Sequence, residues 1–180
     1  MNRRQSATNV PLAVICVGLV LLVVVGFVIG WYHMDRTENV AVSPATNYET
    51  HELESIESYR SQYVGNNSNT VNLINALPLA DRVQRIEILG QDVVITLGPD
   101  LNTDDDETVA PNVLYSAIAI MASIDNVRSV MYDTPSSSYV VSRDDVEARF
   151  GAPLSGLLEN EEKWQGMRNV IPMEVSSLVK

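Results

Sequence analysis

The stretch VLYSAIAIMASI, from Val113 to Ile124, contains no charged residue. Six apolar residues in it recur at helical spacing: Val113, Leu114, Ala117, Ile118, Met121 and Ile124. Residues spaced in this way form a broad apolar stripe along one side of a helix. We therefore predict that this stretch forms the most buried helix of a folded domain.

Short strands are predicted on both sides of this helix. Residues 83–89 alternate apolar and charged side chains, residues 90–92 (Gly-Gln-Asp) are typical of a turn, and residues 93–97 are rich in β-branched side chains. This pattern indicates a strand pair with one buried face. After the helix, residues 127–132 and 139–141 predict two more strands, separated by a turn rich in Pro and Ser.

Helices are predicted before and after the strands. Residues 50–64 and 66–77 each carry apolar residues at helical spacing, and Ser142 followed by Asp145 resembles a capping box that opens a helix. The predicted order ααββαββα indicates an α+β fold, with a mainly antiparallel sheet and packed helices in one small domain. Residues 161–180 are predicted to form either a final helix or a frayed tail.

The amino-terminal region predicts a membrane anchor. Residues 10–32 are almost entirely apolar, and a helix of this length covers about 35 Å, enough to cross the roughly 30 Å hydrocarbon layer with some tilt. Arg3 and Arg4 precede the run, so the positive-inside rule places the amino terminus in the cytoplasm and the rest of the chain outside. A cleaved signal peptide is the alternative, but the run is longer than such peptides use and no small-residue cleavage site follows it.

These features together predict the organisation of the chain. A cytoplasmic tail (residues 1–9) is followed by a transmembrane helix (10–32), a polar spacer (33–49), an extracytoplasmic domain (50–160) and the carboxyl-terminal tail (161–180). The first expected partner is thus the lipid bilayer, through residues 10–32.

The charge and the cysteine content exclude several classes of partner. The chain has 23 acidic and 12 basic residues, a formal net charge of −11, and all the acidic residues follow the predicted span. Because this charge repels phosphate backbones, nucleic acid is not an expected partner. The one cysteine, Cys16, lies inside the predicted span, which excludes an intrachain disulfide and a cysteine zinc site. We expect no cofactor.

Residues 63–79, YVGNNSNTVNLINALPL, resemble the opening signature of an extracytoplasmic domain of unknown function from Gram-positive bacteria. Residues 113–132 resemble the central helix and following strand of that family, and residues 142–151 resemble its closing segment. Single-pass membrane proteins and lipoproteins carry this domain, so the resemblance implies a location outside the membrane. It also implies the fold of that family, but it supplies no catalytic residue. Residues 125–130 are also similar, more weakly, to sporulation and germination domains of the GerM type, which implies an envelope binding module.

The signature supplies the candidate contact residues, which are Tyr63, Gly65, Asn66, Asn67, Ser68 and Pro78. The polar run 66–68 could hold a ligand through its side-chain amides. The competing interpretation, favoured by the residue types, is that these side chains cap the following helix by accepting hydrogen bonds from its free backbone amides.

The sequence contains no recognisable catalytic set. Residues 100–107 include five acidic residues and open like a calcium loop, but Asp105 and Pro111 stand where that loop needs Gly and Glu. We therefore predict a solvated acidic loop and no metal site. His33 and His51 are the two histidines, and both are expected to precede the folded core, where packing would not position them.

The predicted function is a membrane-anchored extracytoplasmic module, not an enzyme, that binds or senses an envelope component or a partner membrane protein. The alternative is a surface hydrolase or cation-dependent enzyme that uses Asp100, Asp104 or Asp106 of the acidic loop.

Overall fold

The computed structural model describes residues 47–98 and 106–180, without the side chains of residues 106–108. The predicted cytoplasmic tail, the predicted membrane span and most of the acidic loop lie outside these residues. Among the helices that are described, none is both long and apolar enough to cross a membrane.

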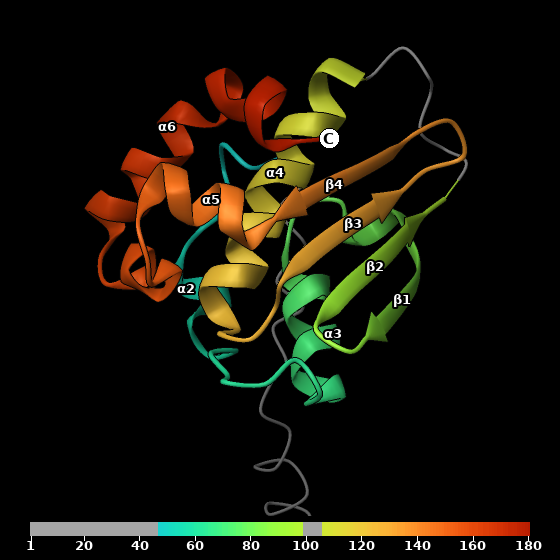
Figure 1. Cartoon of the computed structure of the whole chain (residues 1–180), viewed down its shortest axis with the longest axis horizontal. Helices are drawn as coiled ribbons and strands as arrows, with labels where there is room; N and C mark the ends of the chain where they lie inside the picture. Colours follow the sequence, from blue (N-terminus) through green and yellow to red (C-terminus); the bar gives the residue numbers. More distant parts are fainter. Residues whose placement is uncertain (1–46, 99–105) are drawn as a thin grey trace, which may run out of the picture. The chain divides into compact units, whose positions relative to one another are not determined.

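Four strands form one mixed sheet in the order β1-β2-β3-β4 (Figure 1). They are β1 (Val83–Leu89), β2 (Asp92–Leu97), β3 (Ser129–Asp133) and β4 (Ser138–Ser142). The pairs β1/β2 and β3/β4 are antiparallel, whereas β2 and β3 are parallel. Two of the three strand pairs are thus antiparallel, as expected for most of the sheet, and the central pair makes it mixed. The central pair is parallel because a long helix between β2 and β3 returns the chain to the same end of the sheet.

The first hairpin turns at residues 90 and 91, within the predicted turn 90–92, and Asp92 already belongs to β2. Leu89 pairs with Asp92, and Gly90 between them has a φ of +71°. A tight hairpin turn needs a positive φ at this position, which glycine adopts without steric cost.

Helix α4 (Asp106–Ser123) is the centre of the fold. All residues from 112 to 124 are buried. The helix contacts β3 and β4, and it also contacts α6 (Glu161–Leu178) and the 3₁₀ helix η2 (Leu154–Leu158). Burial extends all round this part of the helix and is not limited to the predicted stripe. A helix without a polar face is stable only when neighbouring elements enclose it.

The carboxyl end of α4 is capped by an arginine from another helix. The Arg143 Nη2 donates to the backbone oxygens of Met121, at 2.7 Å, and Ile124, at 2.9 Å. These carbonyls have no partner within the helix, and a cation here also complements the helix dipole. Arg143 opens α5 (Arg143–Phe150), whose predicted cap is confirmed by the hydrogen bond from the Asp145 backbone to the Ser142 hydroxyl.

The remaining α-helices follow the predicted order, with one addition, but the first one is shorter than the predicted range 50–64 and has only four residues, 54–57. The described elements before the sheet are α2 (Glu54–Glu57), α3 (Asn67–Ala76) and the short 3₁₀ helix η1 (Ala80–Arg82).

The addition is α6, which extends the folded part past residue 160. It buries Trp164, Met167 and Ile171, and the last residue, Lys180, exchanges two backbone hydrogen bonds with Val140 of β4. Of the two alternatives predicted for residues 161–180, the structure therefore has the helix.

Candidate functional site

Four side chains from distant parts of the sequence form a buried polar cluster, which we call the His51 cluster. Its members are His51, Tyr115, Trp164 and Arg168, and none is more than 9% exposed. Tyr115 lies on α4, Trp164 and Arg168 lie one turn apart on α6, and His51 precedes α2.

A hydrogen bond fixes the tautomer of the neutral histidine. The His51 Nε2 lies 2.9 Å from the Ala76 carbonyl oxygen, which can only accept, so Nε2 carries the proton. The other ring nitrogen, Nδ1, then accepts from the Tyr115 hydroxyl at 2.7 Å. The Tyr115 oxygen in turn accepts from the Trp164 indole N–H at 2.9 Å. When His51 is neutral, both of its ring nitrogens, the Tyr115 hydroxyl and the Trp164 indole N–H therefore all have hydrogen-bond partners.

The electrostatics of the cluster favour the same neutral state. Burial lowers the pKa of His51, and the positive charge of Arg168 lowers it further. Burial also raises the pKa of the Tyr115 hydroxyl. A histidine with a lowered pKa is a common general base, but this one is 1% exposed with both nitrogens engaged, so its geometry suits holding the fold.

The prediction that His51 precedes the folded core is wrong. The residues that enclose it, Ala76, Tyr115 and Arg168, are 25 or more positions away in the sequence, so local patterns do not reveal the contact. A weak signal was present in the spacing of Trp164 and Arg168, which places both side chains on one face of a helix.

Arg168 fastens the segment before α2 onto α6. Its Nη2 donates to the His51 backbone oxygen, and its Nη1 donates to the Gln165 Oε1 at 2.9 Å and more weakly to the Glu49 backbone oxygen at 3.5 Å. The Tyr48 backbone N–H donates to the Asn112 side chain of α4 at 2.7 Å. Residues 48–51 are therefore fixed to two helices.

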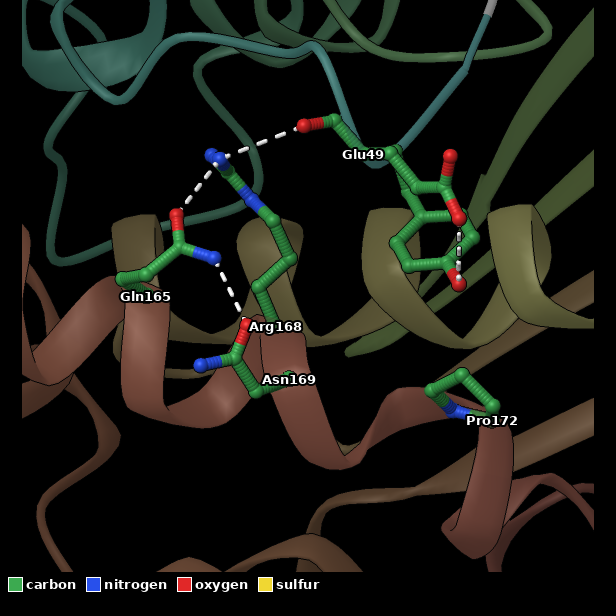
Figure 2. Close-up of a pocket in the computed structure, with 6 residues that line it drawn as sticks. Glu49, Gln165, Arg168, Asn169 and Pro172 are labelled. Atoms are coloured by element: carbon green, nitrogen blue, oxygen red, sulfur yellow. Dashed lines mark hydrogen bonds between the residues drawn. The ribbon is translucent and has the colours of Figure 1, made fainter.

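A pocket of about 300 Å³ lies where this segment meets α6 (Figure 2). It is lined by Tyr48, Glu49, Gln165, Arg168, Asn169 and Pro172. Arg168 forms part of its wall, and the Nε of this residue is buried without a hydrogen-bond partner. Sequence patterns did not indicate this pocket, because its two sides are more than a hundred residues apart.

The predicted contact residues fall in two places. Tyr63 is 66% exposed, and the other residues of the loop 63–68 are exposed as well, except Val64. We use the name signature loop for residues 63–68, which are the turn before α3 and the first two residues of that helix. Pro78 is separate from it, because it is buried at the end of α3, where its carbonyl accepts from the Ser116 hydroxyl at 3.3 Å.

The helix-capping interpretation of the signature loop is wrong. Asn66 occupies the N-cap position of α3, but its side chain makes no capping hydrogen bond. Its backbone oxygen accepts from the Thr70 N–H at 2.9 Å, which is the ordinary first hydrogen bond of the helix. The side chains of Asn66, Asn67 and Ser68 are exposed, and no capping hydrogen bond joins the Asn66 side chain to the helix.

The backbone of the loop is nevertheless fixed. The Val64 N–H donates to the Asn126 side chain at 2.7 Å, and the Val64 oxygen accepts from the Thr70 hydroxyl at 2.9 Å. The Val64 side chain is 1% exposed. The loop therefore presents exposed polar side chains on a backbone that is hydrogen-bonded to the rest of the domain.

A second pocket, of about 320 Å³, adjoins the loop in sequence. It is lined by Arg60, Ser61, Gln62, Ala122, Ser123, Asp125 and Ser155. The Ser123 hydroxyl is buried and has no hydrogen-bond partner among the described residues. Polar side chains thus continue from the signature loop to the end of α4.

The acidic side chains on which the alternative function depends lie outside what the structure describes. Asp100 and Asp104 lie outside the described residues, and Asp106 begins α4 with a side chain that is not described. Within residues 47–98 and 106–180, no group of three or more His, Cys, Asp or Glu residues could hold a metal ion.

Residues 56–143 match the model of DUF4825, a domain of unknown function. The match runs from α2 to the first residue of α5, so it includes the signature loop, the sheet and α4. This confirms the resemblance to a domain of unknown function. No curated protein and no solved structure matches the chain.

Proposed function

We propose that the chain is a membrane-anchored, extracytoplasmic and non-catalytic module that recognises an envelope component or a partner membrane protein through the signature loop. The observation that carries this proposal is that the Asn66 side chain, at the N-cap position of α3, makes no capping hydrogen bond and is exposed.

An ordered backbone with free polar side chains suits recognition. Binding costs less conformational entropy when the backbone of the contact surface is already ordered. Tyr63 adds a large exposed ring, and tyrosines are among the residues that contribute most to the affinity of interfaces. Neighbouring amides and hydroxyls can donate and accept hydrogen bonds, so the loop suits a neutral, polar partner surface.

The location rests on the sequence. The uncharged run 10–32 behind Arg3 and Arg4 favours a single crossing with the domain outside. Protease added to intact cells should then remove the domain from the full chain. Protection of the domain, or its release from the cells as a soluble protein, would reject this topology.

Recognition can be tested by photo-crosslinking in intact cells. A photoreactive amino acid is placed at Asn67 in the signature loop or at Met173, a control position on α6 that is 69% exposed. We expect a discrete adduct from position 67, absent from position 173 and lost when Tyr63→Ala is added. Equal labelling from both positions, or an adduct that Tyr63→Ala leaves unchanged in a folded chain, would contradict the proposal.

A further inference from the structure

The pocket in Figure 2 contains a buried cation without a counter-ion. Arg168 is 9% exposed, and none of the ion pairs among the described residues includes it. Its terminal nitrogens donate to neutral oxygens of Glu49, His51 and Gln165, and its Nε has no partner. A buried charge is normally paired, whereas this guanidinium lies against the Tyr115 ring, 5.8 Å from its centroid, and has no anionic partner among the described residues.

An acidic side chain lies on the same pocket but not on the arginine. The Glu49 carboxylate accepts from the Tyr48 hydroxyl at 3.5 Å (Figure 2). Burial, together with the charge of this carboxylate, raises the pKa of Tyr48. Two opposite charges thus line one pocket without neutralising each other.

The charges decide which class of ligand fits. A simple anion would meet Glu49 and the net charge of −11, and a simple cation would meet Arg168. An apolar ligand would leave both charges desolvated and unpaired. A zwitterion has a group for each charge and no net charge to be repelled.

We infer that this pocket binds a small zwitterion of the free α-amino-acid class, with its carboxylate at Arg168 and its ammonium group at Glu49. The volume of about 300 Å³ is at the lower end of the usual range for ligand pockets, roughly 300–1,000 Å³, which suits a ligand of this size. Tyr48 and Pro172 supply apolar surface for its side chain. This inference does not depend on the function proposed for the signature loop, which lies elsewhere in the domain.

The ligand class can be tested by calorimetric titration of the full chain in detergent. The probes are L-alanine and L-leucine, with propionate and propylamine as analogues that keep one charge each. We expect both amino acids to bind and both analogues to bind at least about tenfold more weakly, because each leaves one charge of the pocket unpaired.

Matched variants connect the binding to the pocket. Glu49→Gln should weaken amino-acid binding about tenfold and leave the fold intact, since the Glu49 side chain is exposed and only its backbone oxygen holds Arg168. Asp125→Asn, an exposed acid in the other pocket, is the control and should change nothing. No heat from either amino acid, propionate binding as tightly as L-alanine, or equal affinity of Glu49→Gln and the parent chain would each overturn the inference.

Discussion

The His51 cluster and the signature loop use similar side chains in opposite ways. In the cluster, the aromatic hydroxyl, the indole N–H and both imidazole nitrogens form hydrogen bonds with one another or with a backbone carbonyl, and all are buried. In the loop, a tyrosine and neighbouring amides face solvent, while only the backbone and the Val64 side chain join the fold. Residue type therefore does not show whether a polar group stabilises a domain or is available to a partner. The hydrogen bonds that the group makes in the folded chain show which of the two roles it has.

The largest expected effect concerns α4, on which the cluster is built. Replacing Ile118, which is fully buried, with Asp places a charge without a partner in the core, at a cost of at least several kcal/mol. We expect the domain to lose its cooperative thermal transition in circular dichroism. Tyr63→Asp is the matched surface control and should melt like the parent chain, so a stable Ile118→Asp domain would show that α4 is not enclosed.

A second prediction removes one atom from the His51 cluster. Tyr115→Phe leaves the His51 Nδ1 and the Trp164 N–H without partners, and each unsatisfied buried group costs about 1–3 kcal/mol. Denaturant unfolding should show this loss, whereas Tyr63→Phe on the exposed loop should change stability by about 0.5 kcal/mol or less. If the two variants lost the same free energy of unfolding, the hydroxyl of Tyr115 would be no more important for stability than the exposed hydroxyl of Tyr63.

The pH dependence of stability should come from the cluster. Because the pKa of His51 is lowered in the folded state, the unfolded chain binds one more proton once the pH falls below about 6.5. This contribution to stability is complete above that pH and is lost as the pH falls towards the folded pKa, by at most about 1.4 kcal/mol per pH unit. Unfolding of the parent and of His51→Gln across pH 5–8 measures it, and parallel curves would show that the histidine is not held neutral.

The smallest effect concerns the caps of two helices. Ser142→Ala should cost about 1 kcal/mol, because the hydroxyl accepts from the Asp145 N–H at the start of α5. Asn66→Ala at the start of α3 should cost less than about 0.5 kcal/mol, because its side chain makes no such bond. Urea titrations of both variants check the pair, and a larger cost for Asn66→Ala would restore the capping interpretation.

Local features of the fold could be predicted from the sequence. The spacing of apolar residues in 113–124 identified the central helix, and Gly90 identified the hairpin turn, because both depend on neighbouring residues alone. Ser142 was correctly predicted as a cap for the same reason. The parallel pairing of β2 and β3 was missed, since it depends on where α4 returns the chain.

The candidate site was less accessible to sequence reasoning. Arg168 and Glu49 line one pocket although they are far apart in the chain, and no local pattern joins them. For residues 161–180 the sequence predicts a helix or a frayed tail, because the final ten residues look frayed, yet Trp164 and Ile171 of α6 are fully buried. The signature loop was found by its residues, but whether they cap or face solvent required the hydrogen bonds of the folded chain.

The central claim is that the polar side chains of the signature loop serve a partner and not the fold. The most direct measurement is the free energy of unfolding of the full chain with Tyr63, Asn66, Asn67 and Ser68 all replaced by alanine. The account predicts a value within about 1 kcal/mol of the parent chain, because four exposed side chains without structural roles contribute little. A loss of several kcal/mol would show that the loop belongs to the fold and would contradict the claim.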